Sequence, residues 1–174
     1  MALGVCLLFD RRSERALRAL WSGLEERGVA TPASHTHGRH HPHLSYVVLL
    51  EWHLDAVQDA VAALPDGGPF ELSFDAVGVF RRGRVALVPP LSARLLARQQ
   101  AVVRAVGGTG ARVHRHYAVD HWVPHASVAT RSAMRQLPAV AESVYEILPL
   151  TVSVTSAALI DSATGRTWPL PVLP

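Results

Sequence analysis

The chain repeats one short pattern whose residue types suit acid–base chemistry: proline, histidine, any residue, serine. The pattern places His43 with Ser45 and His125 with Ser127, and each copy opens an apolar run typical of a strand. Successive side chains of a strand point to opposite faces, so the histidine and serine of each copy are expected to share a face. Each copy therefore offers one imidazole and one hydroxyl to the same ligand.

Two imidazoles and two hydroxyls suit attack on a phosphodiester. In-line displacement at phosphorus needs a base on the entering oxygen and an acid on the leaving oxygen. An imidazole with its ordinary pKa of about 6.5 can take either role near neutral pH. Ser45 and Ser127 would donate to the non-bridging oxygens, whose charge grows in the transition state. The alternative is that both histidines only satisfy backbone carbonyls where the strands begin.

The composition excludes several classes of enzyme. All 17 basic residues are arginine, so a lysyl-nucleotide intermediate, a Schiff base and a P-loop lysine are ruled out. The single cysteine, Cys6, allows no intrachain disulfide and no multi-cysteine zinc site, and its apolar surroundings predict a core residue in a reducing compartment. The net charge of +3 is compatible with a phosphorylated or nucleic-acid ligand.

Length and hydrophobicity predict one compact domain. The 174 residues are 49% hydrophobic and 18% charged, which is enough apolar material for a core. We expect a single domain over 1–174, made of two lobes at about 1–90 and 91–174. The apolar run at 2–9 is too short to span a membrane and ends at charged residues, which favours a cytoplasmic protein with no membrane partner. We expect the protein to be a monomer.

Hydrophobic periodicity predicts the elements that position the two motifs. Strands are expected at 2–9, 44–50, 70–80, 85–88, 126–129, 150–160 and 167–172. Helices are expected from Ser13, as the N-cap, to Gly28, and at 54–64, 91–106 and 132–147. The runs at 70–80 and 85–88 are expected to form a hairpin, as are those at 150–160 and 167–172.

The order of these elements repeats. A shift of 82 residues superimposes the first motif on the second, and the turn residues Gly83 and Arg84 on Gly165 and Arg166. The intervening helices share almost no identity, so we favour a diverged duplication, with chance resemblance of two hairpins as the alternative. A pseudo-twofold between the halves would bring both motifs into one groove.

The strings PHLS at 42–45 and PHAS at 124–127, in this element order, resemble the two-histidine phosphoesterase superfamily, and most closely its 2′-5′ RNA ligase family. The resemblance covers essentially the whole chain. It implies an α+β fold of two pseudo-symmetric lobes of antiparallel sheet, flanked by helices, with a central cleft between them.

The resemblance also implies an activity. Such proteins hydrolyse a 2′,3′-cyclic phosphate or a related cyclic phosphodiester, at an RNA end or in a small nucleotide, to a 2′-phosphate, without a metal or other cofactor. Some members also ligate RNA reversibly. By carry-over, His43 would protonate the leaving 3′ oxygen, His125 would activate water, and Ser45 and Ser127 would hold the phosphate. The two histidines can exchange roles.

Two features depart from the family pattern. Both hydroxyl positions are serine, where threonine is commoner and has fewer rotamers. An arginine often follows the second motif histidine by five residues, but Thr130 holds that place here and Arg131 comes one later. A shift of one residue flips the face of a strand. Arg131 is therefore an open candidate for a phosphate ligand, with a solvated residue as the alternative.

The remaining histidines lie in two loops. The first loop holds His35, His37, His40 and His41, and we expect it to be a mobile polar loop rather than a zinc or nickel site, because no glutamate or cysteine accompanies them. The second loop, at 109–124, holds His114, His116 and His121, and its aromatic residues Tyr117 and Trp122 could stack a nucleobase. Of these, Trp122 is expected to be a buried anchor. Arg81, Arg82 and Arg84, at a hairpin tip, could attract a nucleic-acid backbone, with a solvated turn as the alternative.

Three functions from different classes compete. The leading hypothesis is the cyclic phosphodiesterase, with RNA ligation as a further activity. The alternative is an RNA- or nucleotide-binding module of the same fold without turnover, although binding alone does not require two matched titrating groups. A metal-dependent hydrolase using the loop histidines is least favoured, because it lacks a nearby carboxylate.

Overall fold

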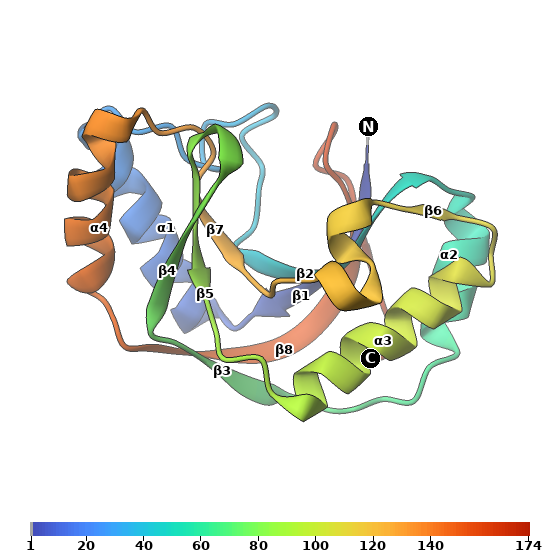
Figure 1. Ribbon diagram of the computed structural model, residues 1–174. Coiled ribbons are helices and arrows are strands. Elements are labelled where there is room, and N and C mark those ends of the chain that lie inside the picture. Colours follow the sequence, from blue (N-terminus) through green and yellow to red (C-terminus); the bar gives the residue numbers. More distant parts are fainter. Residues whose placement is uncertain (1) are drawn as a thin grey trace.

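Nine strands form one antiparallel sheet in the computed structural model, which describes residues 2–174 (Figure 1). The strands are β1 Leu3–Phe9, β2 His43–Glu51, β3 Phe70–Phe74, β4 Ala76–Phe80, β5 Arg84–Val88, β6 Arg112–Val113, β7 Ala126–Ala129, β8 Leu150–Asp161 and β9 Thr167–Pro169. The helices are α1 Arg11–Glu26, α2 Leu54–Ala62, α3 Ala93–Gly107 and α4 Leu137–Tyr145. Short 3-10 turns are η1 Arg81–Gly83, η2 Arg115–Tyr117, η3 Val119–His121 and η4 Met134–Gln136.

The strand order places the two motif strands side by side. It runs β3-β8-β1-β2-β7-β5-β4, with β6 paired to β2 and β9 paired to β8. Strands β2 and β7 meet at the middle of this order. Strand β8 lies among the strands of the first half of the chain, and β4 and β5 lie beside β7. The lobe boundary expected near residue 90 stays a prediction.

Two pairs of helices flank the curled sheet. Helix α1 packs against α4, and α2 packs against α3. Figure 1 shows the first pair on one side of the sheet and the second pair on the other. The 82-residue shift places the span of α1 over that of α3, and α2 over α4, as a duplication requires. The predicted α+β architecture of antiparallel sheet and flanking helices is confirmed.

The two edge strands of the curled sheet are consecutive in sequence. Strands β3 and β4 are the two ends of the strand order, yet only Asp75 separates them in sequence. Our expectation of one strand over 70–80 was therefore wrong. Phe70 pairs with Val154 of β8, whereas Ala76 pairs with Val88 of β5. A continuous apolar run does not record that the chain changes partners halfway, because pairing depends on strands distant in sequence.

The first helix begins with a different cap from the one expected. Asp10 accepts a hydrogen bond from the backbone nitrogen of Ser13 at 2.8 Å, so Asp10 is the N-cap. Ser13 is instead buried, with 6% of its surface exposed, and its Oγ accepts from the backbone nitrogen of Ser153. Gly28 ends the helix at a φ of +75°, as predicted. Asp10 rather than Ser13 caps the helix because its carboxylate lies where it can reach a free backbone N–H of the first turn.

Other element ends differ in smaller ways. The last helix begins at Leu137 rather than near 132, where Pro138 fits the first turn, and η4 precedes it. The last strand ends at Pro169 rather than 172. Within residues 2–174, no helix is long and apolar enough to cross a bilayer.

The core lies on the helix side of the motif strands. Leu44 and Tyr46 of β2 are fully buried, whereas His43 and Ser45, which alternate with them, remain partly exposed. On β7, Ala126 and Val128 are buried and Ser127 is exposed. The predicted alternation therefore holds on both strands, and it leaves the motif side chains on the face away from the core.

Candidate active site

The two motifs come together at the contact of β2 with β7. Within residues 2–174, Leu44 and Ala126 are the registered pair between these strands. In an antiparallel ladder this register sets His43 across from Ser127 and Ser45 across from His125. All four side chains therefore lie on one face of the sheet, around the Leu44–Ala126 pair, as the alternation and the repeat predicted.

Both motif histidines are oriented in the same way. Nδ1 of His43 lies 2.6 Å from the carbonyl oxygen of His41, and Nδ1 of His125 lies 2.8 Å from that of Val123. A carbonyl only accepts, so each ring carries its proton on Nδ1 and donates it. The bonds to carbonyls that we considered as an alternative role do exist. They use one nitrogen of each ring and leave Nε2 as the atom that can exchange a proton with a ligand.

The two imidazoles differ in proton affinity. Burial lowers the pKa of His43, but the Cys6 sulfur and the His41 carbonyl outweigh burial and raise this pKa to about 9. Burial lowers the pKa of His125, and the charges of His43 and Arg84 lower it further, against the hydrogen bond to Val123. Near neutral pH the site therefore holds one protonated and one neutral imidazole.

Cys6 is part of this site. It is buried, with 2% of its surface exposed, as the sequence predicted. Its position in β1 is paired with Ser45, and its Sγ lies 3.4 Å from the Ser45 Oγ. The apolar run around Cys6 gave no sign of this contact, because only strand pairing brings β1 against β2.

Two buried tryptophans hold the motif backbones. The indole Nε1 of Trp122 donates to the carbonyl of Ser45 at 3.0 Å, and that of Trp21 donates to the carbonyl of Ser127 at 3.0 Å. Trp122 is 5% exposed, which confirms it as a buried anchor. Trp21 was predicted only as part of the apolar stripe of its helix.

Aromatic rings border His125. The ring centroid of Phe80 lies 5.3 Å from that of His125, and the ring of Tyr117 lies 6.4 Å from it. Burial raises the pKa of Tyr117 to about 12, so its hydroxyl stays protonated. Sequence analysis identified Tyr117 as a loop aromatic but missed Phe80, because the β4–β5 hairpin carries it to the site.

The first histidine-rich loop forms a stack of rings. The ring centroids of His37 and His40 are 4.1 Å apart, and those of His35 and His40 are 5.9 Å apart. Burial, followed by the charges of neighbouring histidines, lowers the pKa of His40 to about 4. Nowhere in residues 2–174 do three or more histidine, cysteine or acidic side chains gather so that they could hold a metal ion.

One carboxylate does reach this loop, contrary to the expectation that none accompanies it. Oε1 of Glu14, in α1, lies 3.1 Å from Nδ1 of His41 and also accepts from Arg18. Sequence inspection missed this pair because Glu14 precedes the loop by most of a helix.

Arg131 lies just past the end of β7 and is exposed. Its contact with the first half is a backbone bridge to Ala30, and the backbone nitrogen of Thr130 donates to the Ala30 carbonyl at 2.9 Å. Its role as a phosphate ligand stays a prediction.

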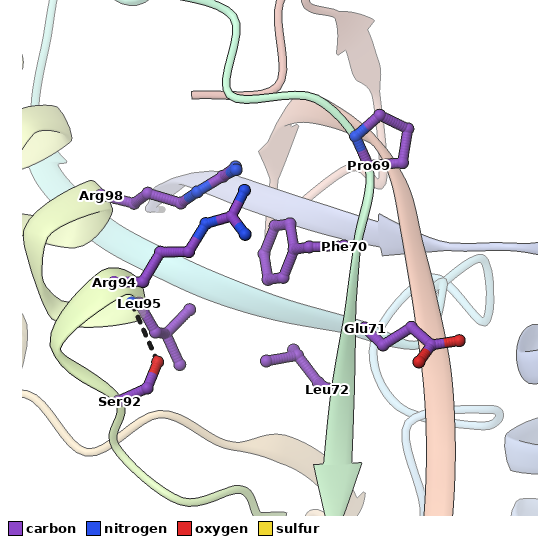
Figure 2. Close-up of a pocket in the computed structure, with 8 residues that line it drawn as sticks. All are labelled: Pro69, Phe70, Glu71, Leu72, Ser92, Arg94, Leu95 and Arg98. Carbon is purple, nitrogen blue, oxygen red and sulfur yellow. Dashed lines mark hydrogen bonds between the residues drawn. The ribbon is translucent and has the colours of Figure 1, made fainter.

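One cavity lies apart from the motifs. It has a volume of about 270 Å³ and lies between β3 and the start of α3 (Figure 2). Arg98 lines it, but the guanidinium stacks 4.4 Å from the Phe70 ring centroid and donates to the Gly67 carbonyl at 2.5 Å. These contacts tie α3 to the neighbouring loop, so the cationic group is already engaged within the fold.

Comparison with known proteins points to one family. The family model described as the 2′-5′ RNA ligase superfamily matches residues 10–166. A comparison with curated protein sequences finds no match.

Solved structures share the fold. The apo form of Escherichia coli LigT is 14% identical, with a TM-score of 0.63, and the likeness covers 97% of this chain and 94% of LigT. A protein described as a phosphoesterase is 18% identical, with a TM-score of 0.60, covering 98% and 94%. Kluyveromyces marxianus Usb1 with uridine monophosphate is 12% identical, with a TM-score of 0.51, and the likeness covers 98% of each chain.

Proposed function

Because the chain belongs to the 2′-5′ RNA ligase superfamily, we propose that it is a phosphodiesterase that opens a 2′,3′-cyclic phosphate, or a related cyclic phosphodiester, to a 2′-phosphate without a metal. The substrate is an RNA end or a small nucleotide. The observation that carries the proposal is the matched orientation of His43 and His125, each of which donates Nδ1–H to a carbonyl and keeps Nε2 for proton exchange. Membership of the superfamily supports phosphodiesterase or RNA-ligase-like activity in general.

The contrasting pKa values favour one distribution of the two roles. His125, with its lowered pKa, is neutral and takes a proton from water through Nε2 as the water oxygen bonds to phosphorus. The bond from phosphorus to the 3′ oxygen breaks, and His43, with its raised pKa, donates its Nε2 proton to that oxygen. The products are a 3′-hydroxyl and a 2′-phosphate. Solvent exchange then restores both protonation states.

The serines complete the site. Ser45 and Ser127 flank the Leu44–Ala126 pair that joins β2 to β7, and their hydroxyls would donate to the non-bridging oxygens of the phosphate. Ser127 is exposed, whereas Ser45 already contacts Cys6, so Ser127 is the freer donor. A 5′-hydroxyl that takes the place of water would give a 2′-5′ phosphodiester by the same proton transfers, which accounts for ligation.

The test is turnover of 2′,3′-cyclic mononucleotides and of an oligoribonucleotide with a cyclic phosphate end, with the product identified by phosphorus NMR. We expect a 2′-phosphate from the wild-type protein and none from His43→Ala or His125→Ala. His116→Ala, an exposed histidine of the second loop, is the matched control and should keep full activity. Binding of these nucleotides without any turnover would favour the binding module instead.

A further inference from the structure

An arginine that sequence analysis placed at a solvated hairpin tip faces the motif site. Arg84 begins β5, the strand next to β7. Two residues along, Ala86 is paired with Ser127. Paired residues of an antiparallel ladder share a face, and so do alternate residues of one strand. The register of this pairing shifts between Val85 and Ala86, so the orientation of Arg84 follows from its own partner on the neighbouring hairpin strand, Phe80.

The neighbours of Arg84 place it near His125. Arg84 is paired with Phe80 across the β4–β5 hairpin, and the Phe80 ring lies 5.3 Å from that of His125. The charge of Arg84 also acts at the site: after burial, it is one of the charges that lower the pKa of His125 and of His114, and it opposes the burial that raises the pKa of Tyr117. The guanidinium of Arg84 is therefore near enough to all three groups for its charge to act on them.

Its backbone is held in place. Residue Gly83, at a φ of +69°, packs so closely on Ser132 that a Cβ there would clash with the Ser132 carbonyl. The backbone nitrogen of Ser132 donates to the Gly83 carbonyl at 2.7 Å. The turn before Arg84 is therefore tied to the segment that follows β7, and the guanidinium projects from a fixed base.

The guanidinium is exposed and has no acidic partner within residues 2–174. In contrast, Arg18, Arg27 and Arg112 each pair with a glutamate. An unpaired arginine at a site that also holds the protonated His43 concentrates positive charge there, which favours an anionic ligand. The planar guanidinium suits two oxygens of one phosphate.

We propose that Arg84 binds the phosphate of the substrate at this site. Arg84 would then take the role of phosphate ligand, for which the sequence made Arg131 a candidate. The inference rests on the proposed function and adds the group that neutralises the charge on the non-bridging oxygens. The hairpin supplies this cation from β5, beside the motif strand, whereas Arg131 lies beyond the end of β7.

The test compares binding of adenosine 2′-monophosphate, the expected product, to the wild-type protein and three variants by calorimetry. We expect Arg84→Gln to weaken binding by about 10- to 100-fold, because a hydrogen bond to a charged group is lost. Arg84→Lys should restore part of the affinity, and Arg131→Gln should leave it unchanged. Because Arg84 is exposed, the melting temperatures of the variants should match that of the wild type.

Two further measurements separate this inference from the proposed function. Proton NMR of His125 should show its pKa rise in Arg84→Gln, since one of the charges that lowers it is removed. If Arg131→Gln weakens binding and Arg84→Gln does not, the inference is wrong even when cyclic phosphates are hydrolysed. If wild type hydrolyses none of them yet binds the nucleotide through Arg84, the inference stands and the proposed activity fails. Absence of both binding and turnover overturns both.

Discussion

The indole nitrogen of Trp122 donates to the backbone carbonyl of Ser45, so a residue next to the second motif holds the first motif in place. Trp21, in the first helix, makes the reciprocal contact with the Ser127 carbonyl. Strands β2 and β7 share one registered pair within residues 2–174, Leu44 with Ala126. Because the ladder between these strands is short, each indole N–H supplies the hydrogen bond that a backbone N–H of a neighbouring strand would ordinarily donate.

Replacement of either tryptophan should damage both the fold and the site. Trp122→Phe and Trp21→Phe keep an aromatic ring but leave a buried carbonyl unsatisfied, which costs about 1–3 kcal/mol of unfolding free energy. Urea unfolding measures this loss, and turnover should fall as well. Trp168→Phe is the control, because Trp168 stacks under Arg166 away from the motifs. Equal effects in all three variants would contradict the anchoring role.

Loss of either motif histidine should remove most of the activity. His43→Ala and His125→Ala should each reduce kcat by about 10²- to 10⁴-fold, which is the usual contribution of a general acid or base. Ser45→Ala and Ser127→Ala should reduce it less, since each removes one donor of two. Steady-state kinetics on a cyclic nucleotide measure the four effects. A serine variant more damaged than both histidine variants would argue against acid–base catalysis by this pair.

The pH profile of kcat/KM should be bell-shaped. Activity needs His125 neutral and His43 protonated, so it should rise as pH passes the lowered pKa of His125 and fall near pH 9, the raised pKa of His43. The two limbs belong to the coupled pair.

Cys6 should influence the alkaline limb of that profile. Cys6→Ala removes a group that raises the pKa of His43, so this limb should move to lower pH. Ser156→Ala, at an exposed position of β8, should leave it in place. An unmoved limb in Cys6→Ala would show that the sulfur does not control this histidine.

Turnover should survive removal of metal ions. The proposed steps use imidazoles and hydroxyls, so dialysis against a chelator should leave the rate unchanged. The variant that replaces His35, His37, His40 and His41 together should lose less activity than either motif variant. A rate that collapses with chelator and returns with zinc or manganese would instead support a metal-bound hydroxide.

The first histidine loop should make the fold less stable in acid. The pKa of His40 falls from 6.5 to about 4 in the folded protein, so between these values the unfolded chain binds more protons. Stability is then lost as pH drops from about 6.5 toward 4. Melting temperatures at several pH values should show a weaker dependence in His40→Gln than in wild type or in His116→Gln. The same dependence in all three proteins would refute the role of His40.

The sequence by itself determined which side chains share a face and which elements repeat. Alternation along the motif strands placed His43 with Ser45 and His125 with Ser127, and the apolar periods located the helices, because both patterns depend only on local backbone geometry. The family resemblance added the fold class.

Only the tertiary structure decided which strands are neighbours. The split at Asp75, the contact of Cys6 with Ser45, and the approach of Arg84 to the site all depend on strand pairing. The unequal pKa values of the two histidines arise in the same way, from burial and from charges brought in by other strands. Pairing is set by how all the apolar surfaces pack at once, and no local stretch of sequence contains that information.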